Sequence, residues 1–153
     1  MNEVLENLIN KLDREIIAYK IVELSAPAMT VPDVIKFAKT PVKDDEVCKT
    51  IMLKTPKGFV GIFLRGYDRL DMKRLDQYFM GKVRFANAEE VKEHANVDPG
   101  AVCPLLLNVP LYIDQRALEL KNTHFGSGDH MFGIEMNPND LLMISKAKKI
   151  NCT

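Results

Sequence analysis

Hydrophobic residues recur at helical spacing at the start of the chain. Val4, Leu8, Leu12 and Ile16 fall on one face, so the spacing predicts an amphipathic helix over residues 3–17. Polar caps or prolines near a first turn begin further helices, which are predicted over residues 31–39, 71–78, 88–94 and 137–144, with a short helical turn over 114–118.

Runs of β-branched and apolar residues alternate with these helices. They predict strands over residues 19–24, 47–53, 59–64, 83–85, 111–113, 122–125 and 131–136. Residues 54–58 have the chemistry of a hairpin loop longer than two residues, so the strands on either side are expected to pair antiparallel. Residues 96–108 predict an ordered loop packed on the core. The interleaving favours an α/β fold with a mixed sheet wrapped by helices.

Length and composition bound the domain organisation. A chain of 153 residues has room for one core, so a single domain over residues 1–153 is expected. Hydrophobic residues make up 46% and charged residues 27%, as in ordinary globular proteins. Lysine plus arginine and aspartate plus glutamate are 21 each. The resulting zero net charge excludes the general basicity that is typical of nucleic-acid-binding domains.

Targeting signals are not evident in the sequence. The first residues are acidic and amphipathic, unlike a secretory signal peptide, and no apolar run approaches the about 18 residues of a membrane span. The three cysteines, Cys48, Cys103 and Cys152, are odd in number and show no CxxC spacing. They favour reduced thiols, so a cytoplasmic protein without membrane contact is expected.

Lys49 interrupts a segment, residues 47–53, that otherwise has the character of a half-buried strand. A lysine is rarely buried without a partner. Its side chain therefore either reaches water along the aliphatic stem or points into a polar cleft. The strand by itself leaves both interpretations open.

The sequence lacks the motifs of several kinds of catalytic site. It has no GxSxG elbow, no HExxH helix and no GxxxxGK[ST] or GxGxxG phosphate loop. A zinc site formed by His124, Asp129 and His130 is an alternative, but six-residue spacing across a glycine turn is a weak metal signal. No metal and no cofactor are therefore expected.

Two glycine-containing segments remain as candidates, Gly100-Ala101-Val102-Cys103-Pro104 and Gly126-Ser127-Gly128. Backbone N–H groups in a tight loop form a concave anion site, which suits the oxyanion that develops during ester hydrolysis. A lysine adds a point charge for phosphate or for the developing negative charge. A purely structural turn explains the first segment equally well.

In order and spacing, these motifs resemble the YbaK-like family of aminoacyl-tRNA deacylases, whose domain is also inserted in bacterial prolyl-tRNA synthetases. Val47-Cys48-Lys49-Thr50 matches a Val-x-Lys-Thr strand start, and Gly100–Pro104 matches a Gly-Gly-Val-Ser-Pro loop. Three further family motifs are matched by Ile113-Asp114, Gly126-Ser127-Gly128 and Asp140-Leu141.

The resemblance implies a single α/β domain with a mixed, mostly antiparallel, barrel-like sheet surrounded by helices. It also implies hydrolysis of the ester of a mischarged tRNA in trans, without a protein nucleophile. Water, the terminal ribose hydroxyl or, in cysteine-specific members, the substrate's own thiol attacks instead.

Roles for individual residues follow from the same resemblance. Lys49 would hold the terminal phosphate or the aminoacyl group, and the amides of Gly100 and Ala101 would hold the carbonyl. The other residues expected to bind substrate are Thr50, Val102, Cys103, Pro104, His124, Ser127 and Gly128.

Some positions distinguish this chain from subsets of the family. Ala101 replaces the second loop glycine of many members, and its methyl group is tolerated at an ordinary φ but strained at a positive φ. Glu23 and Gly133 stand near positions where cysteine-specific members carry an aromatic residue and an aspartate. His124 falls where alanine-specific members have a histidine.

The resemblance implies the 3′ end of an aminoacyl-tRNA as substrate and an aminoacyl-tRNA synthetase as a further partner. A noncatalytic module that binds the same ligand or a synthetase is the alternative, and Ala101 favours it. For tRNA contacts the sequence offers a candidate basic surface, formed by Arg65, Arg69, Lys73, Arg74, Lys82 and Arg84. The competing interpretation is a solvated face balanced by Asp68, Asp71 and Asp76.

Overall fold

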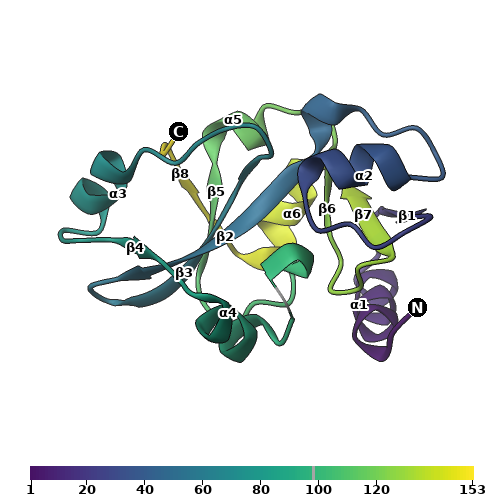
Figure 1. Ribbon diagram of the computed structural model, residues 1–153, viewed down its shortest axis with the longest axis horizontal. Coiled ribbons are helices and arrows are strands. Elements are labelled where there is room, and N and C mark those ends of the chain that lie inside the picture. Colours follow the sequence, from purple (N-terminus) through teal and green to yellow (C-terminus); the bar gives the residue numbers. More distant parts are fainter. Residues whose placement is uncertain (98) are drawn as a thin grey trace.

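Two β-sheets form the framework of the protein (Figure 1). The structure is a computed structural model that describes residues 1–97 and 99–153. The larger sheet has the order β4-β2-β3-β5-β8, formed by Arg84–Phe85, Cys48–Thr55, Gly58–Arg65, Leu111–Asp114 and Lys148–Ile150. The smaller sheet has the order β1-β7-β6, formed by Lys20–Glu23, Phe132–Met136 and Thr123–Gly126.

Both sheets are open, so the expectation of a barrel-like sheet is wrong. A barrel requires continuous pairing around its circumference. A parallel bridge between Val47 and His124 joins the two sheets, but further along β2 the neighbouring strand is β4. β3, β5 and β8 run parallel, whereas the pairs β1–β7, β6–β7, β2–β3 and β2–β4 are antiparallel. The architecture is therefore an α/β domain with mixed sheets, as expected apart from closure.

The helices lie close to their predicted positions. Their bounds are α1 Glu3–Arg14, α2 Val31–Phe37, α3 Met72–Tyr78, α4 Ala88–Ala95, α5 Gln115–Leu118 and α6 Pro138–Ser145, with the short 3₁₀ turns η1 Asp44–Glu46 and η2 Pro99–Ala101. α1 is shorter than predicted because Ile16 has a left-handed φ of 56°, which is incompatible with the helix. In the described part of the chain, no helix is long and apolar enough to cross a membrane.

Side-chain caps explain where these helices begin. The Thr30 hydroxyl accepts a hydrogen bond from the Asp33 N–H at the start of α2, and Asp71 accepts one from Arg74 at the start of α3. Asn87 and Glu90 form a reciprocal capping box on α4. These caps confirm the starts that the sequence predicts.

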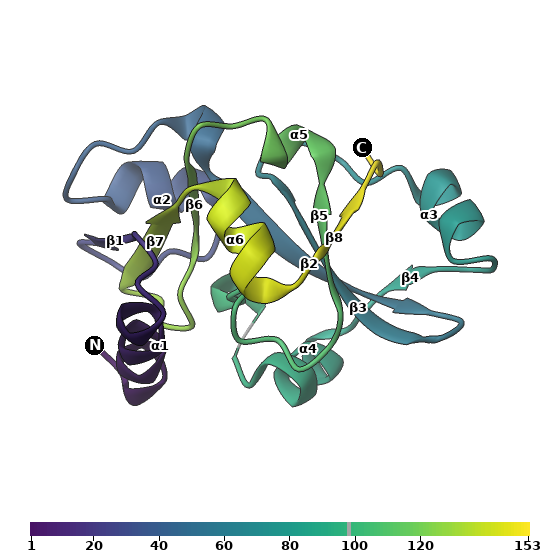
Figure 2. The same ribbon diagram turned by 180° about the vertical axis from the view of Figure 1, so that it is seen from behind.

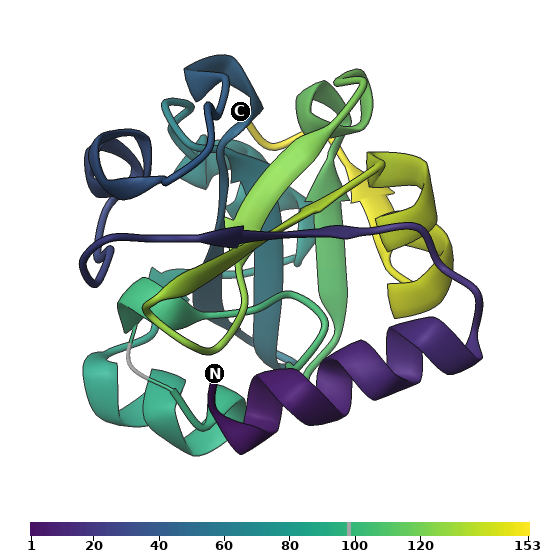
Figure 3. The ribbon, with the colours of Figure 1, turned by 90° about the vertical axis from the view of Figure 1, so that its right-hand side faces the viewer.

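The main core lies between the two sheets, α1 and α6. The Phe63 ring of β3 meets the Phe125 ring of β6 edge to face, with centroids 5.7 Å apart. Figure 2 shows α6 across the side where the sheets meet, and Figure 3 shows α1 running beneath the strands. On the other face of the larger sheet, Leu75 of α3 packs with Leu53 and Leu64. Both faces of the larger sheet are thus covered by packed side chains.

One local prediction is wrong, and one strand was not predicted. Thr55 pairs with Gly58, so the hairpin loop contains only Pro56 and Lys57, and Gly58 allows this tight reversal with a φ of 123°. The basic end of the chain contains an additional strand, β8, which pairs parallel with β5. Exposed lysines are common on such edge strands because they prevent pairing with other chains.

Candidate active site

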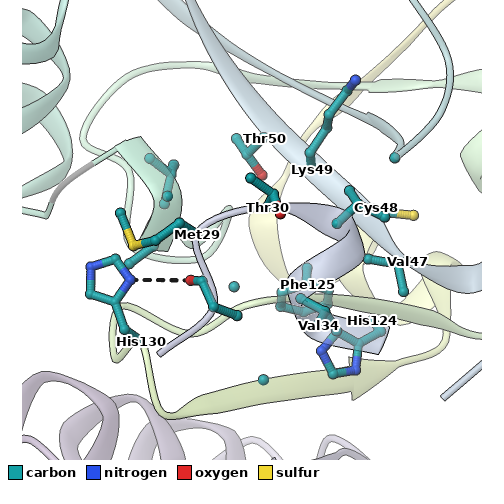
Figure 4. A pocket seen from close by; sticks show the side chains of 18 of the residues that line it. Met29, Thr30, Val34, Val47, Cys48, Lys49, Thr50, His124, Phe125 and His130 are labelled. Carbon is teal, nitrogen blue, oxygen red and sulfur yellow. Dashed lines mark hydrogen bonds between the residues drawn. The ribbon is translucent and has the colours of Figure 1, made fainter. Parts of the chain in front are cut away.

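A pocket of about 430 Å³ lies where the two sheets meet (Figure 4). The Val47–His124 bridge brings β2 and β6 together there. The lining residues come mainly from four segments that are distant in sequence, residues 28–34, 47–51, 100–102 and 124–133. Of the residues that the sequence nominates, the pocket brings together Lys49, Thr50, Gly100, Ala101, Val102 and His124.

Lys49 and Thr50 follow each other on β2, so their side chains point to opposite faces of the strand. The Lys49 ammonium points away from His124 (Figure 4), and the side chain is half-buried. Burial lowers the pKa of Lys49, and the charge of Asp68 partly opposes this. Among the described residues no ion pair or hydrogen bond holds the ammonium. It is therefore available to a negatively charged group at the edge of the pocket.

His124 is the buried polar side chain of the pocket. It is 1% exposed, and desolvation lowers its pKa from 6.5 to about 4, so the ring is neutral at pH 7. Its Nδ1 atom has no hydrogen-bond partner among the described residues, and neither has the buried hydroxyl of Thr50. Two buried polar atoms without partners therefore lie in one pocket, where water or a polar group of a ligand could satisfy them.

Gly133 determines the position of the His124 ring. A Cβ atom at Gly133 would overlap the Nε2 and Cε1 atoms of the ring. Gly133 lies diagonally opposite His124 on β7, so its missing side chain leaves room for the imidazole on this face of the smaller sheet. The glycine at position 133 thus permits the histidine to lie here.

The Gly100–Val102 segment packs closely against neighbouring backbone. A Cβ atom at Gly100 would come within 3.1 Å of Met29 Cα, and one at Gly126 within 2.8 Å of the Val102 carbonyl oxygen. Ala101 is not among the residues with positive φ, so its methyl group causes no backbone strain. Its carbonyl accepts a hydrogen bond of 3.1 Å from the Gly128 N–H. This bond ties the two glycine-containing segments together.

Four of the expected substrate-binding residues lie outside the lining of the pocket. Cys103 is 1% exposed in the main core, and Pro104 is buried. The Ser127 hydroxyl donates to the Phe132 carbonyl at 2.7 Å, and the Gly128 N–H is bonded to Ala101. The expectation that these four residues line the substrate pocket is therefore not supported by its described lining.

Sequence reasoning missed the wall that residues 28–34 form. This segment is held in place where the Ala28 N–H donates to the His130 carbonyl, at 3.1 Å, and His130 Nδ1 lies 3.3 Å from the Ala28 carbonyl. The cap residue Thr30 marked a helix start but gave no signal of a site, because caps are equally common away from ligands.

His124, Asp129 and His130 all line the pocket but do not form a metal site. Within the described residues, no group of three or more histidine, cysteine, aspartate or glutamate side chains is arranged to hold a metal ion. The zinc alternative therefore has no structural support.

Comparison with known proteins decides which family the chain belongs to. Residues 25–144 match the family model described as the aminoacyl-tRNA editing domain. The chain belongs to this family. The editing domain is 28% identical over 111 residues to the proline–tRNA ligase of Staphylococcus epidermidis and 33% identical over 102 residues to that of Sulfurihydrogenibium. These stretches cover 71% and 65% of the chain but only 19% and 18% of the two enzymes.

Two solved structures share the fold of the editing domain. A proposed trans-editing enzyme for prolyl tRNA synthetase superposes with a TM-score of 0.86 at 22% identity, covering 100% of this chain and 98% of that one. The hypothetical protein APE2540 also gives a TM-score of 0.86 at 22% identity, covering 95% and 97%. At this level of identity the similarity concerns the fold.

Four of the six basic residues of the predicted tRNA-binding surface form ion pairs, and for Arg69 and Lys73 none is found among the described residues. Arg65 binds Asp68 at 2.7 Å, Arg74 lies 3.4 Å from Asp71, and further ion pairs join Lys82 to Asp76 and Arg84 to Glu90. Asp68, Asp71 and Asp76 are the aspartates that the interpretation as a solvated, balanced face named. For these residues the structure favours a balanced, solvated surface.

Proposed function

We propose that this editing domain is an aminoacyl-tRNA deacylase, which hydrolyses the ester of a mischarged tRNA in trans. The observation that carries the proposal is the pocket at the sheet junction, which combines Lys49 with two buried polar atoms that lack partners. A cation at the rim suits the phosphate of the tRNA end. The buried atoms suit the aminoacyl group, whose polar atoms must find partners once water is excluded.

The thiol of Cys48 is not suited to attack the ester. Cys48 lines the pocket, but burial raises its pKa to about 12, and the same holds for Cys103 in the core. The thiolate is the nucleophilic form, so both thiols are inert at neutral pH. This supports a mechanism in which water or the ribose hydroxyl of the tRNA attacks.

His124 serves the substrate as a neutral hydrogen-bonding group in this proposal. A pKa of about 4 makes it a weak base at pH 7, so abstracting a proton is not its main contribution. Its unpartnered Nδ1 can instead orient the aminoacyl group. Like Lys49, it then acts by position and electrostatics.

The developing oxyanion is assigned to the loop that contains η2. The first N–H groups of a helical turn lack intrahelical partners, and Pro99 has no N–H. The Gly100 N–H is thus the first donor of this turn, and Gly100 lines the pocket. Preorganised donors of this kind typically contribute about 100-fold or more to the rate.

The test is release of amino acids from a panel of correctly and incorrectly charged tRNAs. Lys49→Ala is expected to lower kcat/KM roughly 100-fold or more on the esters that the wild type cleaves. Lys57→Ala is the matched control, because Lys57 is an exposed lysine in the loop after the same strand. Equal rates in wild type and Lys49→Ala would remove Lys49 from the mechanism.

The panel also decides between catalysis and binding alone. A noncatalytic module of the same family would cleave no ester faster than buffer does. The ordinary backbone of Ala101 removes the main structural reason for that alternative.

A further inference from the structure

A second hollow, of about 170 Å³, lies beside the candidate active site. Thr50, Ile51 and Val102 line both hollows, so the two are neighbours. The rest of the second lining is apolar and comes from β2, β4 and the start of α4: Met52, Phe85, Ala86 and Val91.

Phe85 presents an exposed ring at this hollow. It lies on the edge strand β4, opposite Leu53, and 55% of its surface is exposed. Aromatic rings of this kind are the usual stacking surfaces for unpaired nucleic-acid bases. Met52, Ala86 and Val91 line the same hollow and would add apolar contacts to a base bound there.

Between the two hollows, β2 has an open backbone edge at Thr50. The Val47 carbonyl accepts from Gly66 on the β3 side, and the Met52 carbonyl accepts from Ala86 on the β4 side. Backbone groups alternate in direction along a strand, so the N–H and C=O of Thr50 point to the same side as those of Met52. On that side β2 pairs with β4 only at Leu53 and Lys54 and bridges to β6 only at Val47, so Thr50 lies between the two pairings. An unpaired edge offers a donor and an acceptor next to each other.

We propose that the second hollow binds the adenine base at the 3′ end of the tRNA, stacked on Phe85 and hydrogen-bonded by the Thr50 backbone. The inference rests on the proposed function, which places the ester in the first pocket. The ester and the base are attached to the same terminal ribose, so the base must lie within one sugar of the ester. Adenine carries an amino donor beside a ring-nitrogen acceptor, which complement one C=O and one N–H.

The test measures binding of an uncharged RNA stem–loop that ends in CCA, labelled with fluorescein and followed by anisotropy. Phe85→Ala is expected to weaken binding roughly 5- to 100-fold, the range typical for loss of one stacking ring. Phe85→Tyr should restore most of the affinity because it keeps the ring. Tyr78→Ala is the matched control, since Tyr78 is 50% exposed but lines neither hollow.

A second RNA tests the hydrogen bonds separately. Terminal inosine keeps the purine surface but exchanges the donor and the acceptor at the edge that Thr50 would meet. The wild type is expected to bind this RNA roughly 10-fold less tightly, as for the loss of two hydrogen bonds. Equal binding of the two RNAs, or unchanged binding by Phe85→Ala, would overturn the adenine site.

The outcomes separate this proposal from the deacylase proposal, because the RNA carries no ester. Hydrolysis in the tRNA panel together with equal binding of adenosine and inosine ends removes only the adenine site. A preference for adenosine together with no hydrolysis supports the adenine site and removes only the catalytic proposal.

Discussion

At the scale of the residue, His124 shows how position determines chemistry. Its sequence context, a histidine in a short apolar strand, is compatible with either a ligand or a core residue. In the fold it is buried, neutral at pH 7 and without a partner for Nδ1 among the described residues. The stability and the pocket geometry of the protein should therefore both respond to changes at this residue.

The buried His124 predicts a loss of stability in acid. The pKa is lowered from 6.5 to about 4 on folding, so the unfolded chain binds the proton more tightly between these values. The stabilisation is complete above pH 6.5 and is lost as pH falls toward 4, by up to about 3 kcal/mol. Urea unfolding at pH 7 and pH 4 should show a smaller decrease in unfolding free energy for His124→Gln.

The matched control for this measurement is His94→Gln, since His94 is half-buried beside Phe59. Identical losses in wild type and His124→Gln would contradict the buried neutral histidine.

Gly133 and His124 should be energetically coupled. Gly133→Ala introduces a methyl group where the imidazole lies, and overpacking of this kind costs about 1–3 kcal/mol. In the His124→Ala background the space is empty, so the same substitution should cost much less. A double-mutant cycle of unfolding free energies measures the difference, and purely additive costs would argue against the close approach.

At the scale of the element, β2 contacts three other strands along its length. It pairs with β3 throughout, meets β6 next to its start and pairs with β4 near its end. The open edge between these contacts borders both hollows. Because the β2–β3 hairpin positions this edge, its turn contributes to the site without touching it.

The hairpin turn predicts a purely conformational cost at Gly58. Its φ is 123°, and an added Cβ atom would meet nothing within 4 Å. Gly58→Ala should therefore lower the unfolding free energy by about 1–2 kcal/mol through backbone strain alone. Thermal unfolding against Lys57→Ala, in the same turn, provides the comparison. A variant as stable as the wild type would mean that this turn tolerates an alanine.

At the scale of the whole molecule, the buried carboxylate of Asp114 ties the end of the chain to the larger sheet. Its Oδ1 accepts from the Cys152 N–H at 3.1 Å, and its Oδ2 accepts from the Thr153 hydroxyl at 3.0 Å. Asp114 is completely buried and lies outside the pocket lining. The Ile113-Asp114 motif is thus accounted for by structure.

Removing this carboxylate should destabilise the protein without changing its site. Asp114→Ala leaves the buried Cys152 N–H without an acceptor, and one such group costs about 1–3 kcal/mol. The unfolding free energy should fall by at least this amount, while the deacylation rate per folded molecule stays unchanged. Asp45→Ala, at an exposed aspartate, is the control for stability. A loss of activity at full stability would show that Asp114 acts in the site.

Much of the fold follows from the sequence because its signals are local. Helix caps at Thr30, Asp71 and Asn87 and the alternation in residues 47–53 depend on neighbours a few positions away. The strand β8 was missed because its lysines are typical of a solvated tail, and pairing with β5 alone makes it a strand. Sheet closure was predicted wrongly because the point where β2 exchanges β6 for β4 is not encoded locally.

The predictions for the site also divide into those that the sequence allowed and those that needed the fold. The sequence by itself led to Lys49, the Gly100 loop and His124 as the residues proposed to carry the chemistry, because their types and order resemble a family pattern. Only the tertiary structure decided that Lys49 lies at the rim, that Cys103 and Ser127 are buried outside the pocket lining, and that residues 28–34 form a wall. The physical reason is that the burial of a side chain, its hydrogen-bond partners and its pKa depend on segments far apart in the chain. These segments meet only when the two sheets pack together.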